Sequence, residues 1–117
     1  MDMTEGYEID IYATETGKEP FVEWEDSLDV QTIAKIEARL ARIRSGGNLG
    51  DYNTVNDGVF ELRFDFGPGY RVYFGFGKNK KQLIILLAGG SKRHQSKDIK
   101  KAKEYWHNHL SRDRRKT

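Results

Sequence analysis

Two runs of alternating residues, separated by a tight turn, constrain this sequence more than any other feature. Residues 60–66 and 70–76 place aromatic or aliphatic side chains at every second position, starting at Phe60 and at Tyr70. This period is typical of strands that are buried on one face only. Gly67-Pro68-Gly69 lies between the runs and favours a turn, because glycine admits positive φ and proline presets φ. The sequence therefore predicts a β-hairpin.

The length of the loop decides which residues face each other across the hairpin. A three-residue loop at 67–69 places Asp65 opposite Arg71 and Arg63 opposite Tyr73. One face of the hairpin is then apolar. The other face carries the polar side chains Glu61, Arg63, Asp65, Arg71 and Tyr73.

The remaining segments indicate two further strands and three helices. Residues 7–13 alternate as a first strand, and the uniformly apolar residues 83–88 are typical of a strand buried on both faces. Glu19-Pro20 begins a short helix with Phe21, Trp24 and Leu28 facing the sheet. The second helix follows Asp29 as N-cap, ends at Gly46-Gly47 and buries the stripe Ile33, Ile36, Leu40 and Ile43.

The last helix is predicted to start with Ser96 as N-cap and to run to about Leu110, with its buried side formed by Ile99, Ala102, Trp106 and Leu110. Residues 48–58 indicate a polar loop, and residues 77–81 a second turn. The order β-α-α-β-β-β-α predicts an α+β fold with a mostly antiparallel sheet. We expect the helices on one face of this sheet and the polar face left open.

Length and composition limit the class of protein. With 117 residues the chain is expected to form one domain, with a core at 7–110 and a frayed basic tail at 111–117. The absence of cysteine excludes disulfides and thiolate metal sites, and no apolar run approaches the roughly 20 residues that cross a bilayer. The acidic first residues do not resemble a signal peptide, so the expected location is the cytoplasm.

Charge is distributed unevenly although the net charge is only +2. Acidic side chains gather before residue 30 and basic ones dominate from Lys78 onward, which favours a polyanionic or an acidic partner. Four bases of the second helix, Lys35, Arg39, Arg42 and Arg44, lie largely away from its apolar stripe and are interpreted as a solvated face.

Several chemistries have no counterpart in the sequence. There is no phosphate-binding loop with lysine and serine. His94, His107 and His109 are poor metal ligands without neighbouring acids or cysteines, and His107 and His109 are two apart on a helix and so diverge. We expect neither a metal nor a cofactor.

A group of cations and a phenol remains on the polar side of the hairpin. Arg63 and Arg71 could fork onto phosphate oxygens, Lys92 and Arg93 would enter from the end of the next strand, and Tyr73 could stack a base. The alternative is cross-strand ion pairing, Asp65 with Arg71 and Glu61 with Arg63, on a merely solvated face. The pattern alone leaves both open.

Three segments in order resemble a known family. KEPFVEW, then ELRFDFGPGYRVYFG, then LIILLAGGSKRHQSKDIKKAKEYW are similar to phage-associated addiction-module killer proteins of the RelE/HigB-type toxin superfamily, over about residues 7–110. The resemblance implies a type II toxin that cleaves messenger RNA on the translating ribosome without a metal. It also implies an antitoxin with a helix-turn-helix domain, which forms a hetero-oligomer with the toxin and occludes its surface.

Residue by residue, the resemblance places Arg71 at the scissile phosphate, Arg63 at a basic position of the preceding strand, and Lys92 or Arg93 at the basic position after the last strand. The chain departs from the better-known relatives, which have a lysine near Glu61 and a tyrosine near Asp98 or Ile99. Since an arginine does not shuttle protons at neutral pH, the general acid or base is expected among Tyr73, His94, Glu61 and Lys92. Two alternatives remain: a gyrase inhibitor of the ParE branch, and an inactive remnant that only binds its antitoxin.

Overall fold

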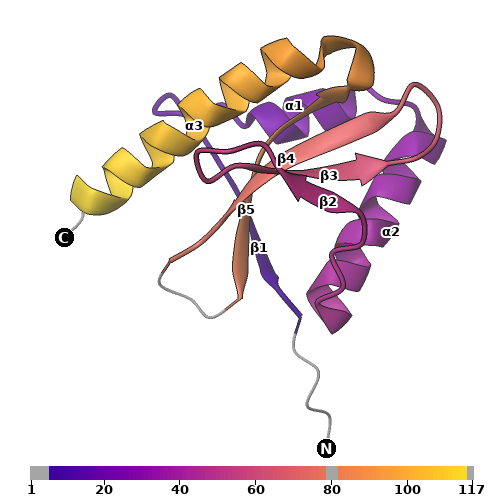
Figure 1. Cartoon of the computed structure of the whole chain (residues 1–117), viewed down its shortest axis with the longest axis horizontal. Coiled ribbons are helices and arrows are strands. Elements are labelled where there is room, and N and C mark those ends of the chain that lie inside the picture. The colour runs from indigo at the N-terminus through magenta and orange to yellow at the C-terminus, as the bar shows by residue number, and fades with distance from the viewer. Residues whose placement is uncertain (1–5, 79–81, 116–117) are drawn as a thin grey trace, which may run out of the picture.

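The computed structural model describes residues 6–78 and 82–115 as a sheet between helices (Figure 1). Positions 79–81 of the predicted second turn and 116–117 of the predicted tail lie outside these ranges. The elements, in chain order, are β1 (Glu8–Ile11), α1 (Pro20–Asp26), α2 (Val30–Gly46), β2 (Tyr52–Thr54), β3 (Phe60–Phe64), β4 (Tyr70–Phe76), β5 (Leu83–Ser91), the 3₁₀ turn η1 (Lys92–His94) and α3 (Gln95–Arg115).

The sheet has five strands in the order β1-β5-β4-β3-β2. β1 runs parallel to β5, and the other neighbouring pairs are antiparallel. The predicted α+β class and the order of the major elements are confirmed. The structure adds the short edge strand β2 inside the segment that we predicted to be a loop.

Helices cover both faces of the sheet, which overturns the prediction of an open polar face. On one face, α1 and α2 pack on the sheet around Phe21, Ile36, Leu40, Leu62, Val72 and Ile84. On the other face, α3 packs through Ala102 and Trp106 against Tyr73, Ile85 and Leu87. Figure 1 shows α3 and α2 on different sides of the strands. The uniformly apolar segment 83–88 is therefore buried on both faces, as predicted.

The hairpin forms, but its register differs from the prediction by two residues. Arg63 faces Arg71 and Glu61 faces Tyr73, because the strands end at Phe64 and resume at Tyr70. The loop is thus five residues long. Gly67 and Gly69 adopt φ of 56° and 80°, and the Gly69 N–H donates to the Phe66 carbonyl at 3.0 Å. A shift of two residues keeps every side chain on its predicted face, since the period of a strand is two.

An extra residue in β5 reverses the faces of the residues that follow it. Tyr73 pairs with Ala88 and Phe74 with Leu86, so Leu87 has no partner opposite it in β4. A bulge of this kind re-aims the end of a strand. Beyond it, a side chain at Gly89 would collide with the Trp24 ring of α1, and one at Gly90 with the Asp98 carboxylate of α3. These two glycines let helices approach both faces.

The predicted helix boundaries are confirmed for α2 and corrected for α3. Asp29 is the N-cap residue of α2 and accepts a hydrogen bond from the Thr32 hydroxyl, and Gly47 ends this helix at φ 74°. Ser96 lies inside α3 rather than at its N-cap. The helix continues to Arg115, so the part of the predicted frayed tail that the structure describes is helical.

Arg39 of α2 is not part of a solvated face. Its guanidinium donates to the carbonyl oxygens of Leu49 and Asp51 at 2.8 and 2.7 Å, donates to the carbonyl of Arg63, and lies over the Phe64 ring. Arg39 therefore ties α2 to the segment before β2 and to the edge of β3. Arg42 and Arg44 are exposed, as predicted.

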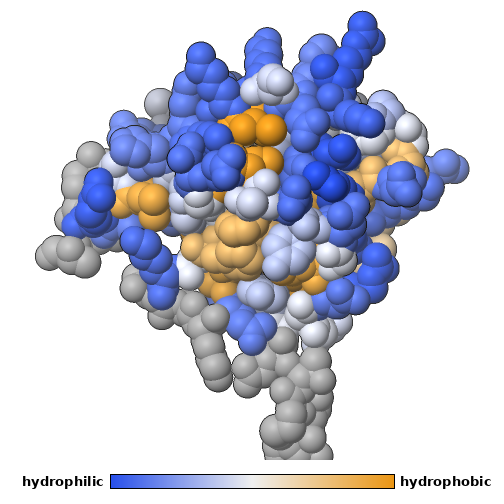
Figure 2. All heavy atoms as spheres, in the orientation of Figure 1, coloured by the Kyte–Doolittle hydropathy of each residue, from blue (hydrophilic) through white to orange (hydrophobic). Residues whose placement is uncertain are grey.

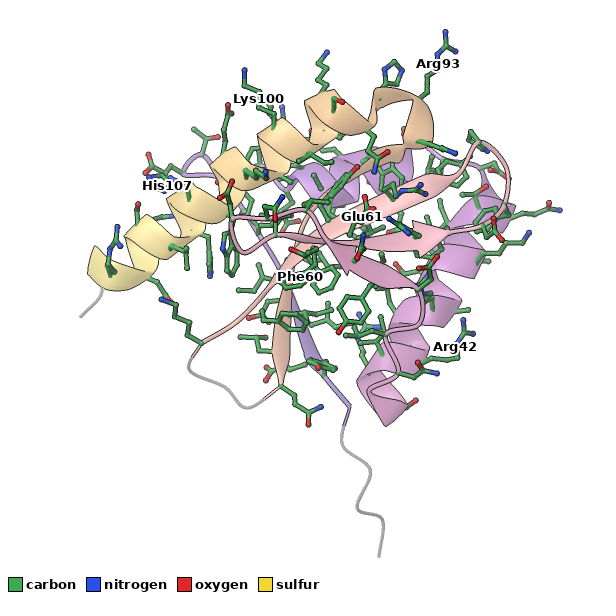
Figure 3. The ribbon with its side chains drawn as sticks, in the orientation of Figure 1. Arg42, Phe60, Glu61, Arg93, Lys100 and His107 are labelled. Carbon is green, nitrogen blue, oxygen red and sulfur yellow. The ribbon has the colours of Figure 1, made fainter. Side chains whose placement is uncertain are left out.

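A cluster of aromatic rings on β2, β3 and β4 extends from the core on the α2 side of the sheet to the surface. The rings of Phe60 and Phe76 lie 5.0 Å apart, and Tyr52 packs on Phe60 at 6.1 Å. Figure 2 shows an apolar area here, one of several on this face, and Figure 3 places Phe60 in the same region.

Candidate active site

A pocket of about 290 Å³ lies where the hairpin loop meets the end of β5. Its wall is formed by Phe64 at the end of β3 and the loop residues 65–69, together with Arg71 and Lys92. The Lys92 N–H donates to the Gly69 carbonyl at 2.6 Å and fixes η1 against the loop. The predicted cations Arg71 and Lys92, 21 positions apart in the chain, thus line one pocket.

Glu61 lies behind this pocket and is only 1% exposed. Its Oε2 accepts a hydrogen bond from Arg63 Nε at 2.9 Å, and its Oε1 accepts one from Gln95 Nε2 at 2.9 Å. Arg71 Nε lies 3.6 Å from the same Oε1. Figure 3 shows Glu61 among the strands rather than at the surface. A carboxylate held in this way is poorly placed to serve as the general base for a bound substrate.

Arg71 is largely buried, with 12% of its side chain exposed. Its Nη1 donates to the Tyr70 carbonyl at 3.2 Å, whereas its buried Nε has no hydrogen-bond acceptor among the described residues. The predicted pairing of Asp65 with Arg71 is replaced by the pair of Glu61 with Arg71, because the register shift moves Asp65 into the loop.

Arg63 shares the carboxylate of Glu61 but lines a different pocket. Its side chain is 38% exposed, and Nη1 lies 4.0 Å from Asp51 Oδ1. The hydrogen bond to Glu61 raises the pKa of Arg63. The pocket beside it also includes Lys35, Arg39 and Arg42 of α2. The two pockets share the wall 64–66, so Arg63 and Arg71 flank the hairpin tip.

Tyr73 cannot take the role that the sequence suggested. The side chain is fully buried under α3, and its hydroxyl has no hydrogen-bond partner among the described residues. Burial, with the nearby carboxylates of Glu61 and Asp98, raises the pKa of this phenol. A base therefore cannot stack on Tyr73, and the hydroxyl is closed to a substrate as an acid or base.

Arg93 and His94 are exposed on η1. Figure 3 shows Arg93 pointing away from the sheet, so the structure does not bring it to the pocket of Arg71 and Lys92. His94 is close enough to Asp98 that its charge lowers the pKa of that carboxyl, while burial raises it more strongly. Asp98 in turn lies over the backbone of Gly90, the cross-strand partner of Arg71.

Gln95, the first residue of α3, is the site residue that sequence reasoning missed. Its position three residues after Lys92 is visible in the sequence, but its amide reaches Glu61 only because η1 turns the chain back over the sheet. Of the other histidines, His107 is exposed and His109 stacks on Trp106 at 5.3 Å. Over residues 6–78 and 82–115, no group of three His, Asp or Glu side chains is arranged to hold a metal ion.

None of the helices that the structure describes combines the length and apolar character that a membrane span requires. No protein-family model matches the sequence. A protein of Haemophilus influenzae (strain Rd), described only as an uncharacterized protein, is 52% identical to this chain over 85 residues. The match covers 71% of this chain and 82% of the relative. At this identity and coverage, the chain belongs to the same family as the H. influenzae protein.

Proposed function

We propose that this chain is the toxin of a type II toxin-antitoxin pair, of the RelE/HigB type, and that it cleaves messenger RNA on the ribosome. The observation that carries the proposal is the pocket at the hairpin tip, where Arg71 and Lys92 line one site together with the loop that contains Gly67 and Gly69. Two cations at one concave site suit a phosphodiester, and a guanidinium can bind two of its oxygens at once. The resemblance of the hairpin and of residues 83–106 to that superfamily supports the same assignment.

The proposed reaction is an internal transfer at phosphorus. The ribose 2′-oxygen forms a bond to the adjacent phosphorus, the bond from phosphorus to the 5′-oxygen breaks, and the products are a 2′,3′-cyclic phosphate and a 5′-hydroxyl. Negative charge increases on the phosphoryl oxygens in the transition state, and Arg71 and Lys92 would stabilise it there. The proton leaves the 2′-hydroxyl and one is delivered to the 5′-oxygen.

The structure narrows the candidates for that proton transfer. Tyr73 and Glu61 are buried, whereas Lys92 lines the pocket and His94 is exposed two residues further along η1. An imidazole has the unperturbed pKa best suited to exchanging protons near neutral pH. In this proposal His94 or Lys92 transfers the proton, and Arg71 remains charged throughout.

In the proposed function the toxin acts in the cytoplasm and has a protein partner there. A helix-turn-helix antitoxin would bind the toxin and cover the pocket, so that free toxin acts only when the antitoxin is lost. An acidic segment of the antitoxin would complement Arg71 and Lys92.

Expression of the chain without an antitoxin tests the proposal. Lys92→Ala and Arg71→Ala are each expected to relieve growth arrest by removing one cation from the pocket. Lys100→Ala is the matched control, because Lys100 is exposed on α3 and points away from the sheet in Figure 3. Thermal unfolding of each purified variant shows whether it is folded.

The result that contradicts the proposal is full toxicity of both pocket variants. Growth arrest with intact messenger RNA and gyrase-dependent DNA breaks would instead select the ParE-like function. A wild-type chain that is harmless when expressed alone would indicate an inactive remnant.

A further inference from the structure

Glu61 is a carboxylate in an unusual place. It lies on β3, the first strand of the hairpin, is 1% exposed, and is bonded to Gln95 in the first turn of α3. Removing a charge from water is costly unless partners replace the lost hydration. The partners here are the side chains of Arg63, Arg71 and Gln95, from three different elements.

The partners of Glu61 are arranged unequally. Arg63 and Gln95 make hydrogen bonds of 2.9 Å with its two oxygens. Arg71 Nε, at 3.6 Å from Oε1, is beyond hydrogen-bond distance and is attracted by charge alone. Gln95 Nε2 is the closer donor to this oxygen. Arg71 is therefore oriented by the negative charge rather than locked by a short bond.

We propose that Glu61 is a positioning residue, whose charge turns the Nε edges of Arg71 and Arg63 inward and sets their guanidinium groups on either side of the hairpin tip. The inference rests on the function proposed above, because it assigns a role to Arg71 in that site. Arg71 lines the pocket with Lys92. Arg63 lines the pocket beside α2.

Gln95 connects the Glu61 carboxylate, and with it the two arginines, to α3. Its amide holds the orientation of the Glu61 carboxylate and is itself fixed by the turn that carries Lys92. Lys92 and Arg71 are thus set relative to each other through two contacts: the backbone bond from Lys92 to Gly69, and the side-chain bond from Gln95 to Glu61.

The test compares Glu61→Gln with the exchanged pair Glu61→Gln/Gln95→Glu. Glu61→Gln keeps the size of the side chain and removes its charge. The exchanged pair retains two side chains able to hydrogen-bond between β3 and α3, but moves the charge to the helix. A purely structural role for Glu61 predicts that the exchange restores both stability and activity. Positioning by charge predicts that it restores stability alone.

Two measurements are made on each variant. Nuclear magnetic resonance of the arginine Nε–H groups reports the environments of Arg63 and Arg71 directly, without any need for activity. Cleavage of translated message gives kcat and KM, and a displaced Arg71 is expected to lower kcat by up to about 100-fold while KM changes much less. Lys100→Ala is again the control.

The outcomes separate the two proposals. Shifted Arg71 and Arg63 resonances in Glu61→Gln, with reduced kcat that the exchange does not restore, support the positioning role. Unchanged resonances, or full activity in the exchanged pair, overturn it. A wild-type chain that cleaves nothing overturns the proposed function, while the resonances still decide whether Glu61 orients the arginines. Should Glu61→Gln not fold, Glu61→Asp keeps the charge but withdraws it from both arginines by one methylene: shifted Arg71 and Arg63 resonances with reduced kcat would support the positioning role, and unchanged resonances would overturn it.

Discussion

Replacing Gly75 by alanine tests whether α3 is packed against the sheet as closely as the structure has it. Gly75 lies in β4 beneath the indole ring of Trp106. A Cβ there would lie 2.6 Å from Trp106 Cε3 and Cη2, roughly 0.8 Å inside ordinary contact at 3.4 Å. The ring cannot slide away easily, because Gly58 borders its Nε1 edge and His109 stacks on it. The side chain or α3 must therefore move.

The expected cost follows from the size of this overlap. Forcing one methyl group into a packed core costs about 1–3 kcal/mol, and the confinement of Trp106 places Gly75→Ala at about 2–3 kcal/mol. For a domain of this size, such a loss lowers Tm by about 6–15 °C. Trp106→Ala alone is expected to cost about 3–5 kcal/mol. In the double variant the added methyl group meets no ring, so the two costs do not add.

Urea denaturation followed by circular dichroism gives the free energy of unfolding for each variant. The double-mutant cycle of Gly75→Ala and Trp106→Ala is expected to show a coupling of about −2 kcal/mol. The matched cycle of Gly75→Ala and Trp24→Ala should be additive within about 0.5 kcal/mol, because Trp24 packs on the opposite face at Gly89. A cost below about 0.5 kcal/mol for Gly75→Ala, or equal coupling in both cycles, would refute the packing of α3 described above.

Two further predictions concern α1 and α2. Arg39→Lys keeps the charge but loses the guanidinium that donates to three carbonyl groups, so we expect the free energy of unfolding in urea to fall by about 2–3 kcal/mol. The control Arg44→Lys, at an exposed position of the same helix, should cost less than about 0.5 kcal/mol. Similar values for the two variants would contradict the role of Arg39. Burial and the nearby carboxyl of Glu37 raise the pKa of Glu25 to about 8. Because the pKa of Glu25 is higher in the folded than in the unfolded state, the protonated carboxyl contributes to the free energy of unfolding. This contribution is fully present below about pH 4.3 and is lost as pH rises through about 8. Between pH 5 and 9 the free energy of unfolding of wild type should therefore fall by about 1–2 kcal/mol relative to that of Glu25→Gln, a value reduced for solvent screening. If the free energies of unfolding of the two proteins changed in parallel with pH, the raised pKa of Glu25 would be refuted.

Much of the fold follows from periodicity, and the part that does not depends on contacts between distant residues. Alternation at 60–66 and 70–76 identified the hairpin and the face of every side chain in it. Its register was wrong because Asp65 and Phe66 fit a strand pattern but belong to the loop. The faces after Leu87 reverse through a bulge, and no local pattern in a run of apolar residues signals one.

The open polar face was the main error, and it has a physical reason. Glu61, Arg63 and Arg71 are charged, so their alternation with apolar residues indicated a solvated surface. In the structure both arginines pair with the buried Glu61 carboxylate at one end of the face, and α3 covers Tyr73 beside them. The buried side of α3 was predicted correctly, but which face of the sheet it covers depends on η1 and Gly90.

The candidate site was predicted only in part, because it too depends on contacts between residues that are distant in the sequence. Arg71 and Lys92 stand at the ends of neighbouring strands, and the strand order alone brings them together. Tyr73 shares its strand face with Arg71 but lies two residues deeper under the helix. Gln95 could not be recognised, since a glutamine at a helix start has many roles and only the turn of η1 directs it to Glu61.

Mapping the ends of a message after cleavage tests the central claim most directly. Purified chain, ribosomes and a translated message are combined, and both ends of each product are identified. New 5′-hydroxyl ends paired with 2′,3′-cyclic phosphates, formed by wild type and by Lys100→Ala but not by Lys92→Ala, are the predicted result. An intact message with the wild-type chain, or cleavage that is unchanged in Lys92→Ala, would contradict the assignment of the pocket at the hairpin tip as a ribonuclease site.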